Sequence, residues 1–412
     1  MFKSVEYVNA THLQEGQTLG SAMAQKVLLV RGGVLGSNTG IGGAHHSLAA
    51  SLGGGGVAGW GLHDVAEYNL GPRPGALQRV FYRWFKHPRT VAQLSQKKHG
   101  ANLIHITDQE QAHLVPRRSD APVIVTVHDL FHLYPYRQTV GTSTVEIGDS
   151  NPSWIRRRDL KKLRQGLARA DLLLCDSQAT LKACKQHFPN VDSIWLPLGL
   201  DIERFAPPNE MPHAPVGPAA HLEKACHMLI VGSHDPRKRM DFLLRVIGSI
   251  HPSVKQDLRI HHVGNGASPV NGLSMSELAQ QASIDRFYAH GGDLSEDALM
   301  DLRHASEVLL FPSISEGFGY PPIEALATGT PVLCADMPSH NELMPEGTCL
   351  PADDVNAWQG AIMKVHEAWK KRTESHDEHV WPTPDEHLIQ HAKTFSIEQF
   401  NQRTAEAYNR FN

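Results

Sequence analysis

Residues 308–332 read VLLFPSISEGFGYPPIEALATGTPV, and this stretch decides the fold. Its first four residues are all apolar, which is typical of a short strand buried on both faces. Glu316 follows on a glycine-rich loop, where the backbone can approach a ligand closely. Two prolines then suit the first turn of a helix and place Glu324 near its N-terminus, where backbone N–H groups favour anions such as a diphosphate. The pattern predicts a ligand site at a strand end, although on spacing alone a plain turn before a dipole-favoured glutamate fits equally well.

The same order of apolar strand and helix extends in both directions along the chain. Strands are predicted at 27–30, 103–106, 123–127, 172–174, 194–196, 228–231, 258–263, 308–311 and 331–334. Helices are predicted at 44–52, 76–98, 156–170, 239–250, 275–284, 295–305, 322–328 and 396–411. Continuous apolar strands separated by helices favour parallel sheets that are covered on both faces. We therefore predict an α/β protein with two doubly wound, Rossmann-like domains.

A proline-rich segment at 206–219 interrupts this series, and the charge changes sign near it. Residues 1–200 contain 22 basic and 14 acidic residues, a net charge of +8, whereas residues 201–412 contain 17 and 29, a net charge of −12. The chain is expected to contain, in order, an N-terminal extension at 1–25, a first domain at 26–205, a linker at 206–222 and a second domain at 223–395. Ligands of doubly wound sheets bind beyond the carboxyl ends of the strands, so a cleft between two facing domains is the expected site.

The composition excludes several classes of protein. Of the 412 residues, 41% are apolar and 20% are charged, which is ordinary for a folded globular chain and excludes wholesale disorder. No apolar run approaches the ~18–20 residues that span a bilayer, and the N-terminus lacks the apolar core of a secretory signal. The five cysteines include no C-x-x-C pair, which fits a reducing compartment. We expect a cytoplasmic protein. The chain also has no P-loop and no clean dinucleotide-binding glycine motif, so a P-loop kinase and a nicotinamide dehydrogenase are disfavoured.

Polar residues follow two further predicted strands. Arg237 and Lys238 come shortly after the strand at 228–231, and a guanidinium with an ammonium could neutralise a diphosphate. His128 follows the strand at 123–127 directly and faces the same kind of crevice. The chain has 26 histidines, so His128 by itself is a weak signal.

The sequence resembles a known family of enzymes. Glu316 and Glu324, with seven residues between them and the Gly-Thr-Pro-Val ending, resemble the two-glutamate motif of the family 4 retaining glycosyltransferases. The resemblance covers most of residues 26–410 and implies the GT-B fold, with two Rossmann-like domains facing a central cleft. It also implies that the terminal helix at 396–412 packs back onto the first domain.

The resemblance implies a role for each matching position. Glu316 would contact the donor sugar, Arg237 and Lys238 would hold the departing diphosphate, and His128 would lie near the reacting centre. These four are the expected catalytic residues. The expected donor-binding residues are Gly42, Gly43, Ser233, Gly264, Leu294, Gly317, Phe318, Gly319 and Glu324. Many relatives have an arginine where this chain has Ser233, and several of the glycines fit ordinary turns equally well.

No metal and no cofactor is expected. The chain lacks the Asp-x-Asp triplet that clamps a metal–diphosphate in the other major glycosyltransferase fold. Four histidines with helical spacing, listed as His376, His379, His387 and His391, lie in a polar segment that favours a solvated helix over a metal site.

The partners expected are a nucleoside-diphosphate sugar and a glycan or lipid-linked acceptor, and no nucleic acid is expected. The aromatic and basic segment 76–98 leaves three alternatives open: peripheral contact with the inner face of a membrane, a helix that packs its aromatic side chains inward, and, least favoured, the binding of single-stranded nucleic acid.

The expected reaction is the retaining, metal-independent transfer of a hexose from GDP-mannose or a UDP-sugar. Two other functions stay open: a GT-B nucleotide-sugar epimerase or hydrolase, and a non-catalytic relative that binds nucleotide sugars.

Overall fold

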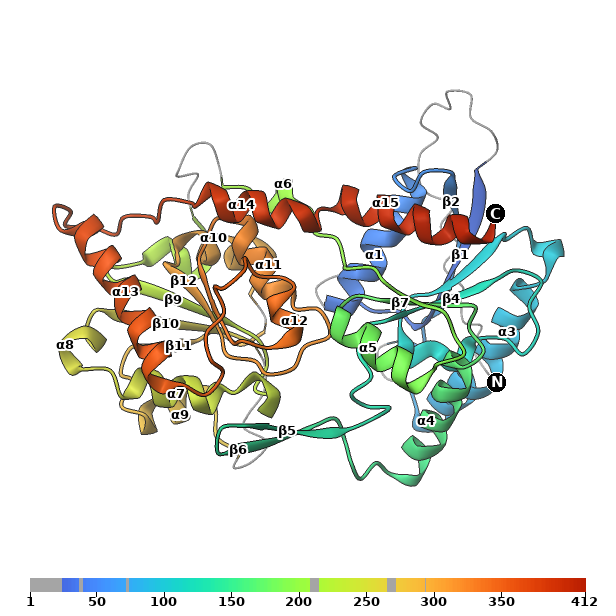
Figure 1. The fold of residues 1–412 in the computed structure, drawn as a ribbon, viewed down its shortest axis with the longest axis horizontal. Coiled ribbons are helices and arrows are strands. Elements are labelled where there is room, and N and C mark those ends of the chain that lie inside the picture. Colours follow the sequence, from blue (N-terminus) through green and yellow to red (C-terminus); the bar gives the residue numbers. More distant parts are fainter. Residues whose placement is uncertain (1–23, 37–39, 72–73, 208–214, 265–271, 293) are drawn as a thin grey trace. The chain divides into compact units, whose positions relative to one another are not determined.

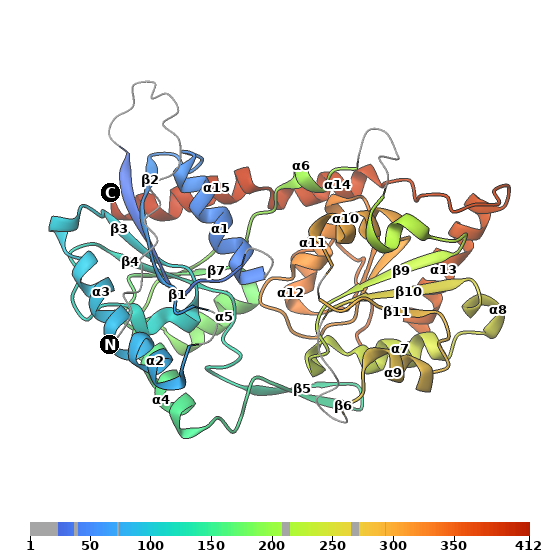
Figure 2. The same cartoon turned by 180° about the vertical axis from the view of Figure 1, so that it is seen from behind.

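The computed structural model describes residues 24–36, 40–71, 74–207, 215–264, 272–292 and 294–412. The chain forms two compact units, each with its own parallel sheet (Figures 1 and 2). The first unit comprises the chain up to Pro135, Gly148–Gly199 and Ile397–Asn412, and the second comprises Tyr136–Ile147 and Leu200–Ser396. This architecture confirms the predicted α/β class.

The first unit contains a six-stranded sheet in the order β2-β1-β3-β4-β7-β8, in which every pair is parallel. Its strands are β1 (Gln25–Gly33), β2 (Trp60–Tyr68), β3 (Leu103–Ile106), β4 (Val123–Val127), β7 (Leu172–Cys175) and β8 (Ser193–Trp195). Its α-helices are α1 (Gly40–Gly53), α2 (Ala76–Phe81), α3 (His87–Leu94), α4 (Trp154–Leu167), α5 (Gln178–His187) and α15 (Ile397–Tyr408). The helix predicted at 76–98 is divided, because a π-helical turn at Tyr82–Lys86 joins α2 to α3.

The C-terminal helix α15 is part of the first unit's core. Its Tyr408 is fully buried, and the Tyr408 hydroxyl lies 2.6 Å from Nδ1 of His105 on β3. The ring of Trp60 packs edge-on against Tyr408, with the ring centres 5.3 Å apart. A buried tyrosine whose hydroxyl is satisfied anchors α15 to the sheet, although 300 residues separate the two in sequence.

The second unit contains a five-stranded parallel sheet in the order β11-β10-β9-β12-β13. Its strands are β9 (Cys226–Val231), β10 (Leu258–Val263), β11 (Phe287–Ala289), β12 (Val308–Phe311) and β13 (Val332–Cys334). Its α-helices are α6 (Ile202–Phe205), α7 (Met240–Gly248), α8 (Pro252–Lys255), α9 (Met275–Gln281), α10 (Glu296–Ala305), α11 (Tyr320–Ala327), α12 (Pro338–Asn341), α13 (Val355–Thr373) and α14 (Glu386–Ala392). The order of the strands changes direction beside β9, and such a switch point is where doubly wound sheets bind ligands.

An antiparallel hairpin, β5 (Tyr136–Val140) and β6 (Ser143–Ile147), belongs to the second unit. The chain enters and leaves this hairpin from the first unit, and residues 136–147 lie in the range expected for the first domain. Val140 is 9% exposed and packs into the second unit's core. Gly141 has φ +58°, and a Cβ there would lie 2.0 Å from the Asp353 carboxylate. The turn of the hairpin therefore fits closely against the second unit.

Candidate functional site

The carboxylate of Glu316 bridges two cations in the second unit. Glu316 lies on the loop after β12, and the 3₁₀ turn Pro236–Lys238 lies beyond β9, the neighbouring strand. The guanidinium of Arg237 donates from Nη1 to Glu316 Oε2 over 2.6 Å, and Lys238 donates from Nζ to Oε1 over 2.5 Å. Two loops from adjacent strand ends thus meet through one carboxylate, as the carboxyl ends of parallel strands allow.

Two members of this cluster are buried, and its carboxylate is ionised. Glu316 is 8% exposed and Lys238 is 9% exposed. Burial by itself would raise the pKa of Glu316, but Lys238 and Arg237 outweigh it and lower that pKa to about 2. Burial lowers the pKa of Lys238, and Glu316 opposes this shift. Asp235 also lies 3.7 Å from Arg237, but its side chain is 45% exposed, so Glu316 is the shielded anion that faces the two cations.

Backbone contacts hold the two loops in register. The N–H of Ile314 donates to the Arg237 carbonyl over 2.9 Å, and Arg237 Nη1 donates to the Ser315 carbonyl over 2.6 Å. The Asp235 side chain accepts the Arg237 N–H over 3.0 Å and caps the 3₁₀ turn. The side chains therefore sit on a fixed frame, which electrostatic stabilisation of a developing charge requires.

Gly232, Gly264 and Gly291 follow the ends of β9, β10 and β11, at the same edge of the sheet. A Cβ at Gly264 would lie 1.9 Å from the Gly232 carbonyl oxygen, so no side chain fits there. The Gly264 N–H donates to the Gly291 carbonyl over 2.7 Å, and the Gly232 N–H donates to the Val263 carbonyl over 2.9 Å. Ser233 directly follows Gly232, and Asp235, two residues later, caps the 3₁₀ turn. The close approach explains why this edge needs glycine.

Helix α11 places Glu324 in an ion pair that the sequence did not reveal. Gly319 has φ +107° and precedes the helix, which begins at Tyr320, so Glu324 is its fifth residue. The Glu324 carboxylate accepts a hydrogen bond from Nη2 of Arg303, which lies on α10 and is 5% exposed. The guanidinium of Arg303 lies over the Phe205 ring, 5.5 Å from its centre. A lone arginine in the last turn of a helix carries no motif, so sequence patterns gave no signal for this partner.

The other expected donor residues have different surroundings. Phe318 is 5% exposed and packs against Tyr320 and Phe395, with ring centres 5.4 and 6.1 Å apart. Leu294 is half-buried directly before α10. Gly42 and Gly43 lie in the first turn of α1, in the first unit. Each unit therefore carries part of the expected set, with His128 also in the first.

His128 is a buried, protonated histidine at the end of β4. Its Nδ1 donates to Asp176 Oδ2 over 2.9 Å and its Nε2 donates to the Thr107 carbonyl over 3.2 Å. Because both ring nitrogens face acceptors, both carry a proton. Burial opposes the charge, but Asp176 outweighs it and raises the pKa of His128 to about 9. Burial raises the pKa of Asp176 to about 6, so the pair is ionised at neutral pH.

Asp176 and Thr107 were not among the predicted residues. Asp176 directly follows the apolar strand β7, just as His128 follows β4, so the same strand-end rule would have found it. The main chain of His128 is also engaged, because its N–H donates to Gln109 Oε1 over 2.9 Å and its carbonyl accepts from Thr180 Oγ1 over 3.1 Å. His128 therefore has an ordered place in the first unit's own hydrogen-bond network.

In the described parts of the chain, no group of three or more His, Cys, Asp or Glu side chains is arranged to hold a metal ion. His376 and His379 lie in the irregular segment between α13 and α14, and not in the predicted helix. The His379 ring packs edge-on against His227 of β9, with the ring centres 5.0 Å apart. His379 is therefore held by a contact with the sheet and not by a helix. Within the same described ranges, no helix is both long and apolar enough to cross a membrane.

Two family profiles match this chain. "Glycosyltransferase Family 4" matches residues 52–204, and "Glycosyl transferases group 1" matches residues 225–368. Curated relatives match over parts of their length. The chain is 40% identical over 76 residues to the O-antigen chain mannosyltransferase RfbU of Salmonella typhimurium, which covers 18% of this chain and 22% of the relative. It is 26% identical over 220 residues to D-inositol 3-phosphate glycosyltransferase of Kribbella flavida, which covers 51% of this chain and 49% of the relative.

Solved structures share the fold over nearly the whole chain. Sucrose-phosphate synthase from Thermosynechococcus elongatus superposes with a TM-score of 0.65 at 19% identity and covers 94% of this chain and 98% of that one. Anabaena Alr3699/HepE in complex with UDP and glucose superposes with a TM-score of 0.63 at 15% identity and covers 93% and 99%. Since the two profiles together match residues 52–204 and 225–368 and the fold is of the GT-B type, the chain belongs to the family 4, or group 1, glycosyltransferases.

Proposed function

We propose that this protein is a retaining glycosyltransferase that moves a hexose from a nucleoside-diphosphate sugar to a glycan or glycolipid acceptor, without a metal ion. The observation that carries the proposal is the cluster of Glu316, Arg237 and Lys238 at the carboxyl edge of the second unit's sheet. A buried lysine and a half-buried arginine, both paired with one carboxylate, suit a diphosphate leaving group.

In this reaction the bond between the anomeric carbon and the diphosphate oxygen breaks, and a bond from the acceptor hydroxyl to the anomeric carbon forms on the same face. The hydroxyl proton passes to the departing phosphate oxygen. Arg237 and Lys238 would stabilise the charge that develops on the diphosphate, and Glu316 would orient the sugar. Glu324, held by Arg303, would accept hydrogen bonds from the ribose hydroxyls. The expected absence of a carboxylate nucleophile favours this front-face route over a covalent intermediate.

The donor is a UDP-sugar or GDP-mannose. One structural relative is described in complex with UDP and glucose, and one curated relative is a mannosyltransferase, so the relatives support both. Calorimetric titration of the purified protein with UDP, GDP and ADP in EDTA separates these donors. We expect one nucleotide to bind tightly without metal. A lack of binding to all three would contradict the assignment of the donor site.

The same preparation tests the catalytic class. Transfer requires an acceptor, whereas an epimerase or hydrolase consumes the donor alone. Incubation of the matching nucleotide sugar with the protein and no acceptor should leave the donor intact over the period in which transfer to an acceptor is complete. Release of free sugar or an epimerised donor at that rate would replace the transferase proposal, and nucleotide binding with no turnover at all would favour a binding subunit.

A further inference from the structure

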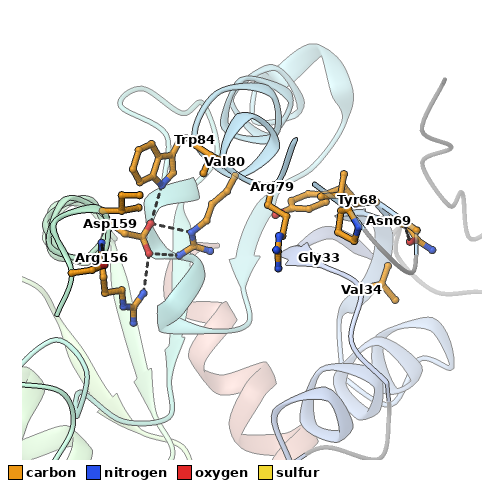
Figure 3. Close-up of a pocket in the computed structure, with 15 residues that line it drawn as sticks. Gly33, Val34, Tyr68, Asn69, Arg79, Val80, Trp84, Arg156 and Asp159 are labelled. Carbon is orange, nitrogen blue, oxygen red and sulfur yellow. Dashed lines mark hydrogen bonds and ion pairs between the residues drawn. The ribbon is translucent and has the colours of Figure 1, made fainter. Parts of the chain in front are cut away.

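The first unit contains a cavity of about 480 Å³ at the carboxyl ends of β1 and β2 (Figure 3). Gly33 and Tyr68, which pair at the ends of these two strands, form part of its lining. Helix α2, the π-helical turn and the first turns of α4 complete it. The carboxyl edge of a parallel sheet is the usual place for a ligand, and a volume of this size holds a small molecule.

One wall of the cavity is fixed by Asp159. Its Oδ2 accepts hydrogen bonds from Arg83 Nη2 and Arg156 Nη1, each over 2.8 Å, and its Oδ1 accepts from Trp84 Nε1 over 3.0 Å. Arg156 also forms a bidentate pair with Glu110, at 2.8 and 2.9 Å. Both arginines of this wall are therefore neutralised by carboxylates, and they give the cavity a rigid side.

Arg79 is different from the other two arginines of the lining. Its side chain is exposed, and it has no hydrogen-bond or ion-pair partner in the described part of the chain. In Figure 3 the Arg79 side chain stands apart from the Asp159 cluster, and no dashed line joins it to another lining residue. An uncommitted guanidinium at a cavity is available to pair with a phosphate in a bidentate manner.

Apolar side chains surround this cation. Val34, Val80 and Ile155 line the cavity, and Ile155 and Val34 remain 53% and 43% exposed. Leu77, two residues before Arg79 on α2, is 87% exposed. A free sugar or a bare phosphate gains little from such surfaces, whereas a ligand with a hydrocarbon chain buries them at about 25 cal/mol per Å².

We propose that this cavity binds the phosphate-bearing end of an amphiphilic acceptor, with the phosphate ester on Arg79 and the hydrocarbon chain along Val34, Val80 and Ile155. That the ligand is a sugar acceptor rests on the function proposed above, whereas the binding site itself rests only on the cavity and its cation. The site lies entirely within the first unit, and the donor cluster lies entirely within the second. Each site can therefore fail in an experiment without the other.

The test uses hexyl phosphate as the probe, with inorganic phosphate and the neutral hexyl glucoside as comparisons. Calorimetry on the full chain should show saturable binding of hexyl phosphate that is at least tenfold tighter than that of either comparison. Arg79→Ala should weaken this binding by about 10- to 100-fold, as the loss of a charged hydrogen-bond partner does. The matched control is Arg89→Ala, an exposed arginine on α3 outside the cavity lining, which should leave the affinity unchanged.

A second variant guards against a trivial loss of charge. Val34→Trp keeps Arg79 and fills the mouth of the cavity from an exposed position, so it should weaken hexyl phosphate binding as well. Equal affinity for inorganic and hexyl phosphate would overturn the amphiphilic class. Equal loss in Arg79→Ala and Arg89→Ala, or binding only to phosphatidylglycerol vesicles and not to the monomeric probe, would overturn the cavity and assign the charge to a membrane surface. Nucleotide binding in each variant reports on the donor site separately.

Discussion

Glu316 and Asp159 are shielded carboxylates that each bridge two cations, and they differ in where their partners come from. Glu316 joins Arg237 and Lys238, which are neighbours on one short 3₁₀ turn at a strand end. Asp159 joins Arg83 and Arg156, which lie on two different helical segments. The first arrangement puts two adjacent cations at the carboxyl edge of the sheet. The second ties two helical segments together and has Glu110 as an additional anion.

This difference shows why an ion pair by itself does not identify a site. Both carboxylates are shielded, with 8% of each side chain exposed. Each set pairs two cations with two carboxylates, because Asp235 lies 3.7 Å from Arg237 and Glu110 lies 2.8 Å from Arg156. What differs is the place: the Glu316 set lies at strand ends beside glycine loops, where parallel sheets bind ligands, and the Asp159 set joins helical segments.

The largest effect is expected from Lys238→Ala. Loss of the buried ammonium should lower the rate of sugar transfer by about 10²- to 10³-fold, the usual result of removing one preorganised electrostatic partner. Transfer assays with saturating donor measure this change. The matched control is Lys364→Ala on the exposed face of α13, which should retain wild-type turnover. Wild-type turnover in Lys238→Ala and in Glu316→Ala would remove the donor-site role of the cluster.

The opposite result is expected from Asp159→Asn. Two arginines would lose their common anion, and the free energy of unfolding should fall by about 3 kcal/mol, which urea titration measures. Nucleotide binding should not change, because Asp159 belongs to the first unit and the donor cluster to the second. A stable variant with impaired nucleotide binding would reverse the contrast between the two carboxylates.

Buried histidines in the two units make the free energy of unfolding depend on pH in opposite directions. His128 is held as a cation, with its pKa raised to about 9, so its stabilising effect is complete below about pH 6.5 and is lost as the pH rises through 9. His105 in the first unit and His261 in the second are buried as neutral rings, and burial lowers the pKa of each to about 3. Their unfolded forms take up protons first, so stability falls as the pH drops below about 6.5.

Urea unfolding between pH 5 and pH 10 should therefore show a maximum in the free energy of unfolding near neutral pH, between the acidic fall below about pH 6.5 and the alkaline fall toward pH 9. His128→Gln should flatten the alkaline fall and leave the acidic fall in place. Persistence of the alkaline fall in this variant would show that a group other than His128 causes it.

The sequence predicted the class of fold and the composition of the Glu316 cluster for a simple reason. Parallel strands end at one edge of a sheet, so polar residues that directly follow apolar runs converge there. That rule needs no long-range information, and the family profiles and the two sheets confirm the fold that it implied. The functional roles of Glu316, Arg237 and Lys238 remain predictions that the transfer assays above will test.

The parts that the sequence did not reveal depend on distant contacts. The Arg303 partner of Glu324 lies in the last turn of another helix, and no local pattern marks it. The hairpin at 136–147 is short and half-exposed, and its contacts with the second unit, among them the burial of Val140, show where it belongs. A strand-end rule cannot find either feature, because both arise from packing between elements that are far apart in sequence.

The smallest effect is expected at this hairpin. The hydroxyl of Tyr136 lies 2.9 Å from Oγ of Ser315, the residue before Glu316, so β5 braces the loop that carries Glu316. Tyr136→Phe keeps the ring and removes one hydrogen bond worth about 1 kcal/mol, which corresponds to about a fivefold change. Nucleotide affinity, measured by calorimetry, should weaken by that factor.

The matched control is Tyr288→Phe. Tyr288 lies on β11, is partly exposed, and its hydroxyl forms no hydrogen bond within the described residues. A brace acts on the geometry of the loop and not on the charge of the site, so Tyr136→Phe should lower affinity without changing its dependence on salt. Lys238→Ala removes a charge and should reduce the salt dependence as well. If both variants changed the salt dependence equally, the hydroxyl would act through the charge of the cluster, and the distinction between the frame and the cations of this site would fail.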